Sequence, residues 1–143
     1  MYCDSAHYQD KRKIVHAYGK VHIRKGDVNL YCDSLFYDEG NKYAKLWGNV
    51  KVRDQAYKLS ADSIDYDVKQ GRAIYRSSGR IESILSNERI TSQHGYFYPN
   101  NGSFFFHGNV DYVKNDLKVT TDTMQFAYEQ QKLYFFGPTN IQN

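Results

Sequence analysis

The stretch Ala44-Lys45-Leu46-Trp47-Gly48-Asn49-Val50-Lys51-Val52 decides the fold of this chain. The residues at every second position are small or apolar: Ala44, Leu46, Gly48, Val50 and Val52. That spacing is the period of a β-strand with one buried face. The stretch from Leu133 to Ile141 alternates in the same way. Both stretches are therefore predicted to be strands, each with a glycine at its centre.

The central glycine belongs to a series spaced by 29, 31, 29 and 29 residues: Gly19, Gly48, Gly79, Gly108 and Gly137. A second series precedes the first by 15 residues, or by 17 in the third case: Asp4, Asp33, Asp62, Gln93 and Asp122. An aromatic residue follows each member of the second series at one fixed offset: Tyr8, Tyr37, Tyr66, Phe97 and Phe126. A fixed period in this range is typical of repeat proteins, in which each unit buries its apolar face against its neighbours. The chain is predicted to hold five units, with a two-residue insertion in the third.

Each unit is predicted to contain two strands of about 11 residues, roughly 36 Å long. Turn-forming residues separate them: Lys25-Gly26-Asp27, Asp38-Glu39-Gly40-Asn41, Lys69-Gln70-Gly71, Pro99-Asn100-Asn101-Gly102 and Asn115-Asp116. Tight turns of this kind favour antiparallel hairpins over a coiled solenoid. The apolar positions between Leu59 and Tyr66 change parity at Asp62, so each strand is expected to bulge or turn a corner there. The expected fold is an all-β sheet folded over at these corners, so that two sheets face each other.

Composition agrees with a single β domain spanning residues 1–143. The chain has 14 Tyr and 8 Phe, which favour strands. Its 19 basic and 16 acidic residues give a net charge of +3, and its longest basic run is Lys11-Arg12-Lys13, so no nucleic-acid partner is expected. No apolar run approaches the length of a membrane helix. Because the sequence opens without a signal peptide, we expect a fragment of a longer precursor whose targeting segment is missing.

The sequence contains no recognisable catalytic site. One acidic residue per unit, interrupted by Gln93, fits a corner residue whose carboxylate accepts backbone N–H bonds better than it fits acid–base or calcium chemistry. The histidines lack zinc-ligand spacing: His7, His16, His22, His94 and His107. No serine-nucleophile or phosphate-loop motif occurs. The chain is predicted to be no enzyme and to need no cofactor or metal.

Two motifs carry a family resemblance. Leu-x-Ala-Asp-x-Ile-x-Tyr-Asp at Leu59 to Asp67 and Ala-x-Leu-x-Gly-Asn-Val-x-Val at Ala44 to Val52, with Gly108-Asn109-Val110 repeating the second, resemble the LptA/OstA family. The resemblance implies a semi-closed β-jellyroll of about ten long antiparallel strands. It also implies a periplasmic, outer-membrane-associated conduit that carries the acyl chains of lipopolysaccharide (lipid A) toward the outer membrane. Gln93, the insertion, and Ser77 and Ser83 at mostly apolar positions depart from the pattern.

The columns expected to face inward supply a candidate lipid-binding groove: Tyr8, Val21, Tyr37, Val50, Val52, Ile64, Tyr66, Ile81, Phe97, Phe106, Val110 and Phe126. The family resemblance implies partners of the same kind, namely Lpt-type β-jellyroll domains that pair through edge strands. An open stack would also allow end-to-end homo-oligomers through the strands near Tyr2 to Tyr8 and Leu133 to Ile141.

Cys3 and Cys32 occupy the same column one unit apart. In a hairpin topology they lie too far apart to bond, so both are expected to remain free thiols.

Two other functional classes stay open on the sequence alone. A structural or self-assembling β-solenoid needs only the repeat and open ends. A polysaccharide-binding or polysaccharide-processing repeat protein is the other class, and catalysis on a polysaccharide would need clustered carboxylates on an exposed groove. The sequence also leaves open whether the domain is a standalone bridge protein or part of a larger translocon.

Overall fold

The computed structural model describes residues 2–9, 11–98, 102–127 and 129–142. These residues form strands joined by turns: β1 (Ser5–Gln9), β2 (Ile14–Lys25), β3 (Val28–Asp38), β4 (Tyr43–Arg53), β5 (Tyr57–Asp67), β6 (Arg72–Tyr75), β7 (Gly79–Ser83), β8 (Glu88–Ser92), β9 (His94–Tyr98), β10 (Ser103–Lys114), β11 (Leu117–Ala127) and β12 (Lys132–Gln142). Within this part of the chain, no helix is long and apolar enough to cross a membrane. The turn expected at Pro99 to Gly102 falls mostly on residues 99–101, which lie outside the described residues.

All strand pairs are antiparallel, and the main path through the sheet runs β1-β2-β3-β4-β5-β6-β9-β10-β11-β12. β5 pairs with both β6 and β7, and β10 pairs with both β9 and β8. β6 and β7 are therefore two parts of one interrupted strand, and β8 and β9 are two parts of the next. Counted this way, the sheet has the roughly ten long antiparallel strands that were predicted. The hairpin connections exclude a coiled solenoid.

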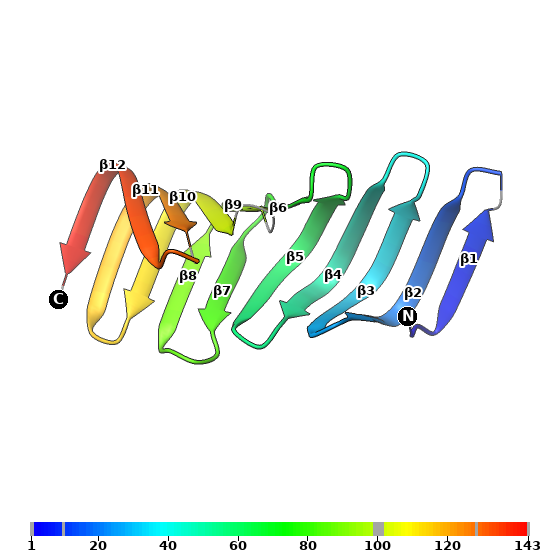
Figure 1. Ribbon diagram of the computed structural model, residues 1–143, viewed down its shortest axis with the longest axis horizontal. Coiled ribbons are helices and arrows are strands. Elements are labelled where there is room, and N and C mark those ends of the chain that lie inside the picture. Colours follow the sequence, from blue (N-terminus) through cyan, green and yellow to red (C-terminus); the bar gives the residue numbers. More distant parts are fainter. Residues whose placement is uncertain (1, 10, 99–101, 128, 143) are drawn as a thin grey trace.

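The strands stand side by side along an elongated molecule, with β1 at one end and β12 at the other (Figure 1). We call the part of each strand nearest the β2–β3, β4–β5 and β7–β8 turns the lower half. The part nearest the β3–β4 turn is the upper half. β7 and β8 belong to the lower half, and β1, β6 and β9 belong to the upper half.

A bulge forms the corner between the two halves. The pairing of β4 with β5 passes from Trp47 opposite Ser63 to Val50 opposite Ala61, so Gly48 and Asn49 together face one residue of β5. Gly48 has φ +82 and Asn49 has φ 50, a left-handed pair that glycine and asparagine adopt more readily than other residues. Equivalent register shifts occur in the pairing of β2 with β3 and of β10 with β11. The corner expected from the change of parity at Asp62 is confirmed.

The aspartate column lies directly over the glycine column. A Cβ atom placed on Gly48 would lie 2.5 Å from the Oδ2 atom of Asp33, and one placed on Gly19 would lie 2.4 Å from the same atom of Asp4. Glycine is therefore required at these positions by space as well as by φ. Asp33 accepts a hydrogen bond from the side-chain amide of Asn49 at 3.3 Å. The sequence predicts a backbone N–H donor for this carboxylate, and the donor seen at Asp33 is a side-chain amide.

Contacts across the interior show that the sheet is folded over. Tyr57 starts β5 at the far end of the lower half, yet its ring centroid lies 6.2 Å from that of Phe104 and 6.1 Å from that of Phe126. Both phenylalanines belong to the upper half, in β10 and β11. Tyr57 could not reach them in a flat sheet, because both lie beyond the corner. The protein is an all-β, semi-closed β-jellyroll, as predicted.

The third unit breaks the pattern at the predicted insertion. β6 ends at Tyr75 and β7 begins at Gly79, and the positive φ of 76 falls on Ser78. The ring of Tyr75 fills the space over Gly79 and Gly95, where added Cβ atoms would lie 2.4 Å and 2.1 Å from ring carbons. Asp62 therefore does not cover the glycine of its own unit. The two extra residues split the sheet here and let one aromatic ring enter the opening.

Candidate functional site: the apolar interior

Rows of inward-facing side chains cross the whole sheet on both sides of the corner. In the lower half, one row of directly paired residues runs from β2 to β12: Ile23, Leu30, Val52, Leu59, Ile81, Ile90, Tyr112, Val119 and Ile141. Each member is aliphatic or aromatic. The lower half therefore presents one continuous apolar strip from strand to strand.

The upper half has a matching row that runs from β1 to β12: Tyr8, Val15, Tyr37, Ala44, Tyr66, Ala73, Phe97, Phe104, Phe126 and Leu133. Aromatic rings stack within it, and Phe97 and Phe104 have ring centroids 4.3 Å apart. The two rows belong to the two facing halves of the fold. Together they line its interior.

All but one of the residues predicted to line the groove belong to the core. Seven are buried: Val21, Val50, Ile64, Ile81, Phe106, Val110 and Phe126. Four are half-buried and pack against those: Tyr37, Val52, Tyr66 and Phe97. The exception is Tyr8, which keeps 57% of its surface exposed. Its expected burial is wrong, because β1 pairs only with β2 within the described residues, and none of their other strands covers that side.

Other interior residues were missed by the sequence reasoning. Ile90 and Val119 are buried in the lower row, and Leu35 and Leu46 are buried in a neighbouring row with Ile64. Alternation along the strands would have identified Leu35, Ile90 and Val119. Leu46 was predicted to face inward by the alternation from Ala44 to Val52, but it was not included among the groove residues. Tyr75 is also buried, but no periodic signal marks it because it lies at the split between β6 and β7. Its hydroxyl shares a 2.5 Å hydrogen bond with Ser92, and burial raises the pKa of Tyr75 to about 12.

The interior is closely packed in this conformation. A cavity of about 10 Å³ lies between the halves, lined by residues such as Leu59, Ile81, Phe104 and Phe106. A space of this size holds about one water molecule. Lipid chains would therefore have to displace side chains or separate the two halves.

Side-chain contacts join the two halves across the seam opposite the corner. Within the described residues, no strand of the lower half pairs with a strand of the upper half across this seam. The contact of Tyr57 with Phe104 and Phe126 is of this side-chain kind. Opening the seam would cost apolar contacts but no backbone hydrogen bonds of the sheet.

Both ends of the sheet are open. In the part of the chain that the structure describes, β1 pairs only with β2, and β12 pairs only with β11. Apolar side chains are exposed beside these edges, including Tyr8 at 57%, Phe136 at 48% and Ile141 at 59%. Unpaired N–H and C=O groups on such strands can pair with another chain.

Among the described residues, no three His, Cys, Asp or Glu side chains gather as a metal site requires.

A family model for OstA-like proteins matches residues 1–122. The chain belongs to the OstA-like family. The fold of this OstA-like chain also matches the crystal structure of LptH from Pseudomonas aeruginosa, the LptA-homologous periplasmic component of the lipopolysaccharide transport device. The TM-score is 0.74 at 9% identity, and the match covers 81% of this chain and 94% of LptH. No curated protein matches the sequence.

Proposed function

We propose that this OstA-like chain is a non-catalytic lipid conduit that carries the acyl chains of lipopolysaccharide in its interior. The observation that carries the proposal is the continuous apolar lining, which runs unbroken from β2 to β12 in the lower half and from β1 to β12 in the upper half. Burying a methylene group against such a lining contributes about 0.8 kcal/mol. The family match and the fold shared with LptH support the same role.

Acyl chains enter through the seam opposite the corner. Separating the halves there exposes the apolar rows without breaking the pairing of neighbouring strands, and the entering chains replace the lost side-chain contacts. The lining residues of the conduit are the eleven predicted residues in the core, with Phe104, Ile90 and Val119 added from the structure. Sugars and phosphates stay outside the fold.

Similar domains join this one through its open edges. Pairing of β12 from one domain with β1 of the next continues the sheet and aligns the two interiors. The partners are other Lpt-type β-jellyroll domains or further copies of this chain. The location that this role requires is the periplasm, with contact to the outer membrane at one end of the assembly.

Native mass spectrometry with lipopolysaccharide tests the proposal. The wild-type chain should retain bound lipid, and Val110→Glu should abolish the complex because Val110 is fully buried in the lining. Val113→Glu is the matched control, since Val113 lies on the same strand but faces outward opposite Arg89 and Lys118. Unchanged lipid binding by a folded Val110→Glu variant would overturn the proposal.

A further inference from the structure

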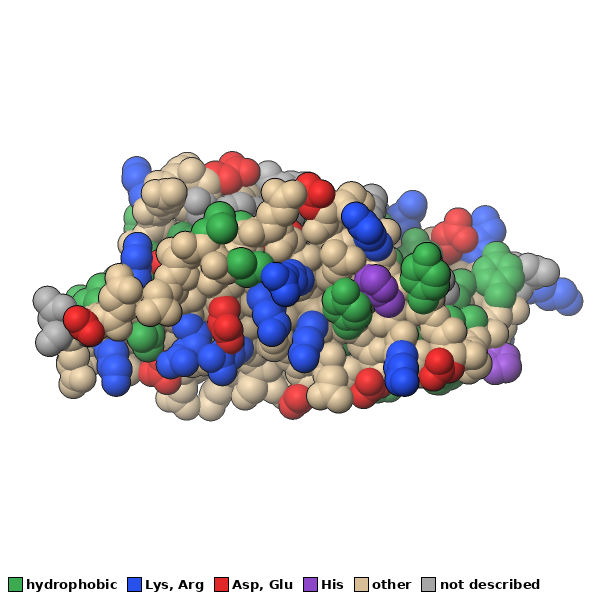
Figure 2. All heavy atoms as spheres, turned by 90° about the horizontal axis from the view of Figure 1, so that it is seen from below, with side chains coloured by type: hydrophobic (Ala, Val, Ile, Leu, Met, Phe, Trp, Pro, Cys, Tyr) green, Lys and Arg blue, Asp and Glu red, His purple; other side chains and the backbone are tan. Residues whose placement is uncertain are grey.

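The outer face of the lower half is basic. Its outward-facing strand positions carry seven cationic residues, Arg24, Lys51, Arg53, Lys58, Arg80, Arg89 and Lys118, and two acidic ones, Glu82 and Asp111. The corresponding positions of the upper half hold three of each kind: Lys45, Arg72, Lys132, Asp38, Asp65 and Asp67. Figure 2, which views the molecule from the side of the β4–β5 and β7–β8 turns, shows Lys and Arg side chains gathered near the middle of its length. These strand positions therefore carry more positive charge on the lower outer face than on the upper one, and the exposed carboxylates of Asp33, Asp62 and Asp122 lie at the corner between the two.

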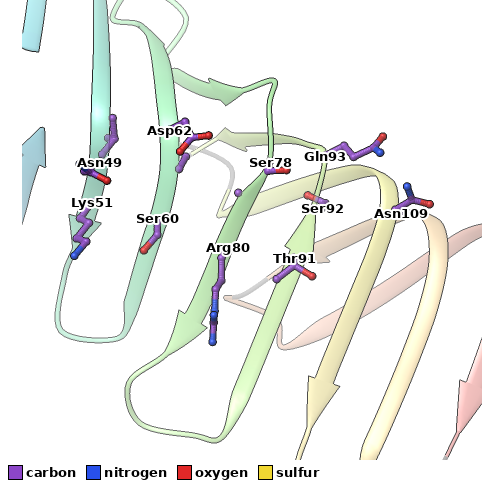
Figure 3. Close-up of a pocket in the computed structure, with 13 residues that line it drawn as sticks. Asn49, Lys51, Ser60, Asp62, Ser78, Arg80, Thr91, Ser92, Gln93 and Asn109 are labelled. Carbon is purple, nitrogen blue, oxygen red and sulfur yellow. The ribbon is translucent and has the colours of Figure 1, made fainter. Parts of the chain in front are cut away.

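A groove of about 540 Å³ lies on this basic face. Its floor is a row of paired outward residues on β4, β5, β7 and β8: Lys51, Ser60, Arg80 and Thr91. Its upper wall carries the amide side chains of Asn49, Gln93 and Asn109 and the carboxylate of Asp62 (Figure 3). Its volume falls in the range of about 300–1,000 Å³ that is usual for small-molecule sites.

The insertion in the third unit accounts for the position of this groove. In the second unit, the Asp33 side chain covers Gly48. In the third unit, Tyr75 covers Gly79 from the inside, and Asp62, which is exposed like Asp33, lies on the outer surface beside the split. The groove therefore forms at the unit whose corner differs from its neighbours.

The cations of the groove are spaced for a ligand with separate anionic groups. Lys51 and Arg80 flank Ser60, so their Cα atoms lie two strand spacings apart, about 10 Å. Arg80 pairs with Glu82 through its Nε atom at 2.5 Å, which fixes the side chain and leaves other guanidinium donors free. Within the described residues, Lys51 has no carboxylate at ion-pairing distance.

We propose that this groove binds a saccharide that carries phosphate or carboxylate groups. Lys51 and Arg80 contact the anionic groups, the amides of Asn49, Gln93 and Asn109 bond to sugar hydroxyls, and Asp62 accepts a hydroxyl hydrogen bond. The ligand is a free acidic saccharide, because the groove lies on the outer surface at the corner, away from the seam through which acyl chains would enter. This binding does not rest on the proposed conduit function.

Isothermal titration calorimetry of the full chain tests this site with a bisphosphorylated glucosamine disaccharide that lacks acyl chains. We expect saturable binding that Lys51→Gln with Arg80→Gln weakens at least about tenfold, as expected for lost hydrogen bonds to charged groups. The dephosphorylated disaccharide and inorganic phosphate should each bind at least about tenfold more weakly than the phosphorylated sugar. Lys45→Gln with Arg72→Gln is the matched control on the other outer face and should change the affinity less than about twofold.

Absence of saturable binding to the phosphorylated disaccharide would overturn the proposal, as would equal losses in the two double variants. Because the disaccharide carries no acyl chains, its binding does not depend on the interior, so failure of the lipid conduit leaves this site testable by itself. An acylated, phosphorylated glucosamine disaccharide that binds this groove more tightly than the acyl-free form would contradict a site separate from the interior. Equal affinities identify a free saccharide.

Discussion

The hydroxyl oxygen of Tyr75 lies 2.5 Å from the hydroxyl oxygen of Ser92, inside the sheet where the third unit splits. Ser92 in turn donates to the backbone carbonyl of His94 at 2.9 Å. Because the Ser92 proton is used in that second bond, Tyr75 is the donor in the first. This short chain of hydrogen bonds ties β6, β8 and the start of β9 together at the point where the regular pairing is interrupted.

Tyr75 should make the protein sensitive to alkaline pH. Burial raises the pKa of Tyr75 from 10.0 to about 12, so the stabilisation linked to its proton is fully present below pH 10 and is lost as the pH rises toward 12. Burial and the hydrogen bond to Glu88 shift the pKa of Tyr112 in the same direction. Near neutral pH, Tyr75→Phe should lower the free energy of unfolding by about 1 kcal/mol. That difference should shrink and then reverse between pH 10 and pH 12.

Urea denaturation at pH 8, 10, 11 and 12 measures this effect. Tyr134→Phe, at an exposed position, should differ from the wild type by less than about 0.5 kcal/mol at neutral pH. A constant gap between the wild type and Tyr75→Phe across the whole pH range would contradict the assignment.

Two corner glycines with the same φ should respond differently to alanine. Gly48 and Gly137 both have φ +82, but an added Cβ would lie 2.5 Å from an Asp33 carboxylate oxygen at Gly48 and 3.3 Å from the Asp122 Cβ at Gly137. Gly137→Ala should cost about 1–2 kcal/mol from the left-handed backbone alone. Gly48→Ala should cost more, because the Asp33 side chain must also move. Equal losses of unfolding free energy for Gly48→Ala and Gly137→Ala, measured by thermal or urea denaturation, would show that contact with the aspartate side chain adds no cost at Gly48.

The two cysteines should stay reduced and react at different rates. Cys3 and Cys32 are both free thiols. They lie on the strands on either side of Val21, so their Cα atoms are two strand spacings, about 10 Å, apart. That distance is too long for a disulfide. Burial, together with the neighbouring Asp33 charge, raises the pKa of the Cys32 thiol to about 11. Cys32 should therefore react slowly with a disulfide reagent at pH 8 in the native protein, and the half-buried Cys3 should react faster. Thiol counting on denatured, unreduced protein should find two thiols, and a Cys3–Cys32 disulfide would refute the strand order.

The open edge of β12 should mediate self-association. Tyr134→Lys with Phe136→Lys places two charges on exposed positions of that strand and should suppress end-to-end pairing. Val28→Lys, exposed on the interior strand β3, should leave association unchanged. Sedimentation velocity over a range of concentrations measures the effect. A wild-type chain that stays monomeric at high concentration would refute the role of this edge.

Alternation and the two residue series were enough to predict the strands, the corner and most of the core, because burial of one face fixes which parity points inward. The exposure of Tyr8 could not be predicted in this way, since it depends on whether another strand lies beside β1. The partner of Asp33 was also missed, because it depends on the direction of the Asn49 side chain at the bulge.

No sequence pattern predicted the groove on the outer face. Lys51 and Arg80 are 29 positions apart, and only the pairing of β4, β5 and β7 brings them to either side of Ser60. The insertion could be located from the spacing of Asp62 and Gly79, but the entry of Tyr75 into the opening depends on packing in three dimensions.

The corner has a consequence for the length of the fold. The Gly48–Asn49 bulge bends the strand within its own unit, so the cross-section of the interior does not depend on how many units are stacked. In a closed barrel, by contrast, the diameter changes with every strand added. Gaining or losing one two-strand unit would change the span of this fold by about 10 Å and leave its cross-section unaltered. The number of stacked units therefore determines the length of this fold, and the cross-section stays the same.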